Sequence, residues 1–148
     1  MSGQTLAELA VTFSAETIRA YGGSGRHLHA DVAIARELGF PDLVSWGTLT
    51  ILPFSALLDE IAGPDWAVGG VLTVRLSRPV CAGDTVTYAA SEVPAPAAPE
   101  PGLRARRTIA LQASSTRLGV VAVAEATLPR SSTSDPAGKE RDDQPAHA

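Results

Sequence analysis

The sequence predicts a single α+β domain in which a curved antiparallel sheet wraps around one long buried helix. The first supporting observation is length, because 148 residues suit one domain. The second is the segment 49–61, whose apolar residues cover most of a helix circumference, as in a helix that other elements surround. The third is the change to alternating apolar and polar residues after this segment, which is typical of strands with one buried face.

A strand and two short helices are predicted before the long helix. Residues 5–13 alternate weakly and fit a first strand. Ser14 is a suitable N-cap for a helix over 15–21, and Asp31 is one for a helix over 32–38. The second of these helices is predicted to bury one face, formed by Val32, Ala35 and Leu38.

Four strands are predicted after the long helix, over residues 72–76, 86–90, 104–115 and 120–128. Asp84 lies in a turn between the first two of them, where a short carboxylate can bind nearby backbone N–H groups. The last strand is predicted to bury alternate residues, namely Val120, Ala122, Ala124, Ala126 and Leu128.

The domain is predicted to cover residues 1–129. Residues 130–148 are polar and charged without apolar periodicity, so we expect a disordered tail there. A sheet wrapped around one helix leaves exposed strand edges, and pairing with a second copy protects such an edge. We therefore expect a homodimer.

Composition excludes several classes of protein. The net charge of -4 argues against a nucleic-acid partner, because neutralising phosphates requires a clustered positive surface. The single cysteine, Cys81, cannot form an internal disulfide and fits a small buried hydrophobe. No signal peptide and no apolar segment long enough to span a membrane is recognisable, so we expect a cytoplasmic protein without a membrane partner.

The stretch 21–49 resembles the signature region of MaoC-like dehydratases and R-specific enoyl-CoA hydratases, which have the hot-dog fold. That family has an Asp-x-Asn-Pro-x-His-x-Asp motif, then Gly-Phe, then His-Gly at the start of a central helix. The matching residues here run from Ser24 through His29 and Asp31 to Gly39-Phe40 and Trp46-Gly47. Later segments, Ser77-Arg78-Pro79-Val80 and Ala82-Gly83-Asp84, resemble the family's Arg-x-Pro-Val and Gly-Asp turn.

The resemblance implies roles for three residues of this sequence. His29 falls on the family's catalytic histidine, and Asp31 on the helix-capping aspartate that follows it. Gly47 falls on the glycine whose backbone N–H holds the thioester oxygen. These roles suit the chemistry, because an N–H at a helix start stabilises a developing enolate and a histidine can move the proton.

Four positions depart from the family pattern, and one of them is His27, which replaces the proline. Ser24 stands at the position of the catalytic aspartate, and a serine cannot act as a carboxylate base. Arg26 replaces the asparagine, and it is either a polar loop residue or a partner for a carboxylate or phosphate of the substrate. Trp46 replaces the histidine of His-Gly, where it either lines the acyl pocket or packs in the core. Thr48, beside Gly47, is a further candidate for substrate binding.

His27 has two interpretations, a solvated surface residue or a second proton carrier in place of the missing aspartate. A metal site formed by His27, His29 and Asp31 is possible by residue type, but no fourth ligand is evident. We therefore expect no metal, and we expect no cofactor.

The resemblance predicts an enzyme that adds to or eliminates from an enoyl or β-hydroxyacyl thioester of coenzyme A or an acyl carrier protein. With Ser24 in the site, an amine or hydroxyl nucleophile is as suitable as water, which favours specialised, polyketide-like or fatty-acyl metabolism. The alternatives are a non-catalytic hot-dog subunit that binds an acyl chain or an active partner, and a hot-dog thioesterase. A hot-dog thioesterase usually needs a carboxylate in its active site at or near the central helix. It is disfavoured here because Asp59 and Glu60 lie at the far end of the long helix.

Overall fold

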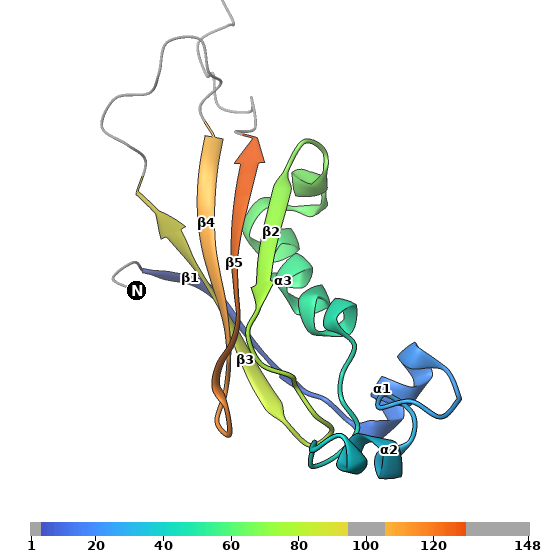
Figure 1. Ribbon diagram of the computed structural model, residues 1–148. Helices are drawn as coiled ribbons and strands as arrows, with labels where there is room; N and C mark the ends of the chain where they lie inside the picture. Colours follow the sequence, from blue (N-terminus) through green and yellow to red (C-terminus); the bar gives the residue numbers. More distant parts are fainter. Residues whose placement is uncertain (1–3, 95–105, 130–148) are drawn as a thin grey trace, which may run out of the picture.

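The computed structural model describes residues 4–94 and 106–129 (Figure 1). Its elements in chain order are β1 (Thr5–Thr12), α1 (Ala15–Gly22), α2 (Val32–Glu37), α3 (Gly47–Ala62), a 3-10 helix η1 (Pro64–Ala67), β2 (Val71–Leu76), β3 (Thr85–Val93), β4 (Arg106–Ser115) and β5 (Gly119–Pro129). This is the predicted α+β arrangement of one sheet and one long helix. The predicted tail over 130–148 and the start of the third predicted strand lie outside the described residues.

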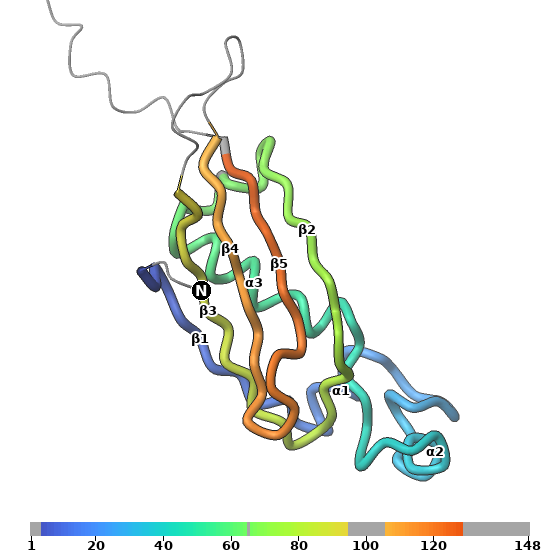
Figure 2. The backbone as a smooth tube through the Cα atoms, turned by 60° about the vertical axis from the view of Figure 1, so that its left-hand side comes forward, coloured from blue at the N-terminus to red at the C-terminus, as the bar shows by residue number. Residues whose placement is uncertain are grey.

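The five strands form one antiparallel sheet in the order β1-β3-β4-β5-β2. The long helix α3 runs along one face of this curved sheet, and α1 and α2 lie together at the end of the domain where α3 begins (Figures 1 and 2). Strands β1 and β2 form the two edges of the sheet. The prediction of free strand edges is therefore confirmed for the single chain.

The core lies between α3 and the concave face of the sheet. Phe54, Leu57 and Leu58 of α3 are buried, and the Phe54 ring packs edge-on against Tyr88 of β3 at a centroid distance of 5.1 Å. The Tyr88 hydroxyl donates a hydrogen bond of 2.9 Å to the carbonyl oxygen of Thr50, and burial raises the pKa of Tyr88 well above its usual value. This buried phenol ties the first turn of α3 to the middle of the sheet.

The helix α3 is covered on one side only in the single chain. Leu52 is 51% exposed although the sequence places it on a helix that is apolar nearly all round. The exposed apolar side faces away from the sheet because one five-stranded layer can cover only one side of a helix.

A β-bulge changes which residues of β5 face the core. Val120 was expected to be buried, but it is 40% exposed, whereas Val121 is fully buried. The register between β4 and β5 shifts between Ala113 and Ser114, so one extra residue enters β5 at this point. Beyond the bulge the predicted alternation is confirmed, because Ala122, Ala124, Ala126 and Leu128 are buried.

Side-chain caps begin the two short helices as predicted. The Ser14 hydroxyl accepts a hydrogen bond of 3.0 Å from the backbone N–H of Thr17, and the Asp31 carboxylate accepts one of 2.9 Å from that of Ala33. The predicted buried face of α2 is wrong at Leu38, which is 58% exposed. The helix ends at Glu37, so Leu38 no longer follows the helical direction that buries Ala35.

The carboxylate of Asp84 connects the turn before β3 to the turn between β4 and β5. Asp84 is 6% exposed and accepts hydrogen bonds from the backbone N–H of Cys81 at 2.8 Å and from the Arg117 guanidinium at 2.7 and 2.6 Å. The bonded Arg117 holds the pKa of Asp84 below its usual value, against the effect of burial. Cys81 is buried as predicted, and burial raises the pKa of its thiol.

Within the described ranges, no helix is both long and apolar enough to cross a membrane.

Candidate functional site

His29 is held in a fixed orientation next to the start of α3. Its ring Nδ1 lies 2.7 Å from the carbonyl oxygen of Val44. A carbonyl oxygen can only accept, so Nδ1 carries the proton and donates it. In the neutral ring Nε2 is then unprotonated, which is the form that a general base requires.

Trp46 packs face to face on the His29 ring, with a centroid distance of 4.0 Å and an interplanar angle of 23°. The indole also approaches the end of α1, where a Cβ added to Gly22 would lie 2.0 Å from Trp46 Nε1. Only a glycine leaves room for the indole at this position. Trp46 therefore restricts the tilt of the imidazole, and Gly22 restricts the position of Trp46.

His27 lies in the loop after α1, near this stacked pair. Its ring centroid is 5.7 Å from that of His29 and 6.1 Å from that of Trp46. Two buried ring nitrogens, His27 Nδ1 and Trp46 Nε1, have no hydrogen-bond partner among the described residues. The interpretation of His27 as a solvated surface residue is therefore wrong, because the ring is partly buried against two other aromatic rings.

The start of α3 is not capped by any side chain. Trp46 occupies the N-cap position and makes no capping hydrogen bond, unlike Ser14 and Asp31 at the other two helices. The first N–H groups of a helix are unpaired within the helix and carry partial positive charge, which suits an oxyanion. Gly47 is the first residue of α3, and a Cβ there would lie 3.0 Å from Leu76 Cδ1 of β2, so the Leu76 side chain packs closely against the helix start.

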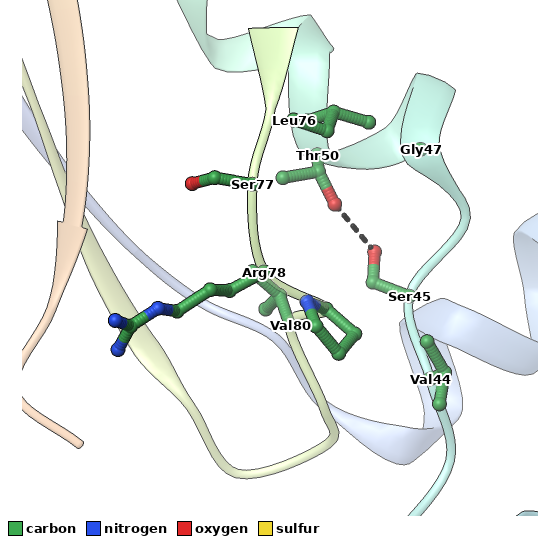
Figure 3. A pocket seen from close by; sticks show the side chains of 9 residues that line it. Val44, Ser45, Gly47, Thr50, Leu76, Ser77, Arg78 and Val80 are labelled. Carbon is green, nitrogen blue, oxygen red and sulfur yellow. Dashed lines mark hydrogen bonds between the residues drawn. The ribbon is translucent and has the colours of Figure 1, made fainter. Parts of the chain in front are cut away.

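A pocket of about 320 Å³ lies beside this helix start, between the chain that enters α3 and the chain that leaves β2 (Figure 3). The lining residues are Val44, Ser45, Gly47, Thr50, Leu76, Ser77, Arg78, Pro79 and Val80. Its volume is at the lower end of the range for small-molecule sites. An acyl group that entered it would lie next to the uncapped end of α3.

No protein-family model matches the chain, and no curated protein matches it. Solved structures do match. An (R)-hydratase from A. caviae involved in PHA biosynthesis is 23% identical, with 86% of this chain and 94% of that chain covered and a TM-score of 0.66. An R-hydratase from Pseudomonas aeruginosa is 22% identical, with coverages of 87% and 81% and a TM-score of 0.65. The ChsH1-ChsH2 complex from Mycobacterium tuberculosis is 22% identical, with coverages of 87% and 98% and a TM-score of 0.66.

The chain has the hot-dog fold. The single long helix against one antiparallel sheet, together with these matches, confirms the predicted fold class. At identities below 25% the matches establish the fold, while the reaction has to be argued from the site.

On this hot-dog fold the predicted site residues are only partly brought together. Trp46 and Gly47 lie at the start of α3 beside His29, whereas Thr48 is exposed in the first turn. Ser24 and Arg26 lie exposed in the loop after α1. Of the six candidates, Gly47 alone lines the pocket, and the adjacent Val44 links the pocket to His29 through its carbonyl oxygen.

Most of the pocket was not predicted from the sequence. Ser45 and Thr50 lie on either side of the Trp46-Gly47 pair, and their hydroxyl groups carry no spacing signal of their own. The segment 77–80 of this wall appears in the sequence only as part of a motif. The one signal that could have found this wall is that motif's resemblance to the family.

We predict that Gly22→Ala destabilises the protein although alanine favours helices more than glycine does. The added methyl group would overlap the Trp46 indole, so we expect the free energy of unfolding in urea to fall by about 1–3 kcal/mol. The matched control is the same substitution in a Trp46→Leu background, where the loss should largely disappear. An equal loss in both backgrounds would contradict the packing argument.

Proposed function

We propose that this protein acts on an enoyl or β-hydroxyacyl thioester by reversible addition or elimination at the β-carbon. His29 is the general acid and base, through Nε2. The N–H groups at the start of α3, with that of Gly47 first, hold the thioester oxygen as the enolate forms. The role of the enzyme is then to place one proton carrier and one oxyanion site around the same acyl group.

One observation supports this proposal above the others. The imidazole of His29, whose Nδ1 is hydrogen-bonded to the Val44 carbonyl oxygen, lies next to the start of α3. This helix start has no side-chain cap, and its first residue lines a pocket. Neither feature alone indicates an activity, since a tied histidine can be structural and a helix start can be solvated. Their combination on a fold that the R-hydratases share supports the reaction class.

The proposed site suits an amine or a hydroxyl as the nucleophile as well as it suits water. Water addition in such a site requires a carboxylate that accepts a proton from the water, and Ser24 stands at that position in the predicted motif. A neutral amine is a stronger nucleophile than water and attacks without first losing a proton. A single imidazole can then accept the proton that the attacking nitrogen releases and deliver it to the α-carbon. This difference is consistent with a role in specialised or polyketide-like metabolism rather than in bulk fatty-acid turnover.

The carrier of the acyl group is coenzyme A or an acyl carrier protein, and the active form is a homodimer in the cytoplasm. The apolar side of α3 and the edge strand β2 support dimerisation, because Leu52, Val71 and Leu76 are all exposed there. Two of the matched solved structures are themselves complexes, ChsH1-ChsH2 and HadBC.

The direct test is mass spectrometry of products from a panel of enoyl thioesters, each offered to the purified protein with water, a primary amine or an alcohol. We expect a mass increase that equals the added nucleophile and that depends on the protein. If no thioester gains mass with any nucleophile, the alternative of a non-catalytic acyl-binding or partner subunit takes the place of the enzyme. Release of free acid instead would indicate the thioesterase alternative.

A further inference from the structure

Two hydroxyl groups face each other inside the pocket beside the start of α3. The side chains of Ser45 and Thr50 are only 6% and 3% exposed, and both line the pocket. Figure 3 shows their oxygens directed toward one another, while the side-chain oxygen of Ser77 and the guanidinium of Arg78 point away from them. Of the polar side chains that line the pocket, those of Ser45 and Thr50 thus face each other, and those of Ser77 and Arg78 do not.

The protons of both hydroxyl groups are already used within the protein. Thr50 Oγ1 donates to Ser45 Oγ at 3.2 Å, and Ser45 Oγ donates to the carbonyl oxygen of Trp46 at 3.2 Å. That carbonyl also accepts the backbone N–H of Thr50 at 3.0 Å, and Thr50 Oγ1 lies within hydrogen-bond distance of it at 3.1 Å. The proton of Thr50 therefore has an acceptor inside the protein, whether that acceptor is the Trp46 carbonyl or Ser45 Oγ. A hydroxyl has one proton and two lone pairs. What remains on these two oxygens is the capacity to accept hydrogen bonds.

The apolar surroundings of these free lone pairs make them selective for ligand groups that donate a hydrogen bond. The other side chains of the wall are apolar near the pair, namely Val44, Leu76, Pro79 and Val80. In an apolar pocket a ligand group that donates a hydrogen bond to an oxygen is favoured over a methyl group, and a group that only accepts gains nothing. The pair therefore distinguishes ligands by whether they carry an O–H or N–H.

We propose that Ser45 and Thr50 form a specificity subsite that selects an acyl group carrying a hydroxyl or amino group, rather than a plain hydrocarbon chain. This inference rests on the proposed function, because it takes the pocket as the acyl site, and it adds the substrate class. Ser77 lines the same pocket but donates its proton outward to the carbonyl oxygen of Val120 at 3.3 Å, so it does not belong to the subsite.

The test is calorimetric binding of acyl-pantetheine amides, in which an amide replaces the thioester so that no reaction or lactone formation occurs. Three acyl groups of the same length are compared: one ends in methyl, one in hydroxyl and one in fluorine, which has no proton to donate. We expect the hydroxyl compound to bind the wild type about fivefold to tenfold more tightly than the other two, which is the effect of one net hydrogen bond.

Two variants and one control assign the preference to its residues. Ser45→Ala and the isosteric Thr50→Val should each reduce or remove the preference, while Ser77→Ala should keep it. Equal binding of all three compounds by the wild type would overturn the subsite, and so would tight binding of the fluorine compound or an unchanged preference in both variants. A different result would contradict the proposed function itself: none of these amides binds, and no thioester is converted in the product assay.

Discussion

Replacing His29 by asparagine should lower kcat/KM of the thioester reaction by about a hundredfold to ten-thousandfold, the usual loss for a general acid or base. The asparagine side-chain amide can take the place of ring Nδ1 and keep the hydrogen bond to the Val44 carbonyl oxygen. Asparagine has no proton-accepting nitrogen at the position of Nε2. The variant therefore removes the proton carrier while it keeps the local structure, and steady-state kinetics on whichever thioester the wild type converts would measure the loss.

His27→Asn is the matched control for the histidine substitution. His27 lies in the same loop, with its ring centroid 5.7 Å from that of His29, but it has no tie to Val44. We expect a much smaller loss of kcat/KM in this variant. The opposite result, a severe loss for His27 and a mild one for His29, would assign the proton transfer to His27 and replace the proposed mechanism.

Replacing Asp84 by alanine should lower the free energy of unfolding by about 2–4 kcal/mol. The substitution leaves the buried N–H of Cys81 without its acceptor and removes the two hydrogen bonds from Arg117. The loss is smaller than for a fully enclosed ion pair, because the side chain of Arg117 is 45% exposed and water can solvate it. Urea unfolding followed by circular dichroism measures the difference.

The same carboxylate should make the wild type sensitive to acid. The pKa of Asp84 is lower in the folded protein than its ordinary value of 3.8, so its contribution is present above that pH and is lost as the pH falls below it. The stability of the wild type should consequently fall more steeply below about pH 4 than that of Asp84→Asn, whose amide does not titrate. Parallel curves for the two proteins would contradict a role for the charge.

Glu92→Gln provides the comparison for both measurements on Asp84. Glu92 pairs with Arg107 at 2.9 Å on the surface, with side-chain exposures of 48% and 30%. An exposed pair of this kind contributes about 0–1 kcal/mol. A similar loss for Glu92→Gln and Asp84→Ala would mean that burial of the Asp84 carboxylate has little effect.

The elements of the fold were predictable because each depends on residues close together in the chain. Ser14 and Asp31 cap their helices as the spacing indicates, and the alternation of β3 and β4 places its apolar residues in the core. The predicted buried face of β5 was wrong at its start, because that face depends on a bulge. A bulge is a property of the register between two strands, which the pattern of a single strand does not contain.

The site was predictable only in part, and for the same reason. The resemblance to the dehydratase motif indicated His29 and Gly47 as candidates, and in the structure a hydrogen bond to Val44, three residues before Gly47, holds the imidazole of His29. The packing of Trp46 against both His29 and Gly22 could not be foreseen, since it requires the end of α1 to lie close to the residue before α3.

The sequence by itself determined the fold class, the caps, the position of the long helix and the two positions on which the proposed chemistry depends. Only the tertiary structure decided which hydroxyl groups face the pocket, which histidine nitrogen carries the proton, and that Asp84 meets Arg117 across 33 positions. Caps and periodicity are set by the conformation of neighbouring residues. Hydrogen bonds and packing between distant segments are set by the distances between elements after they dock, and those distances do not follow from local pattern.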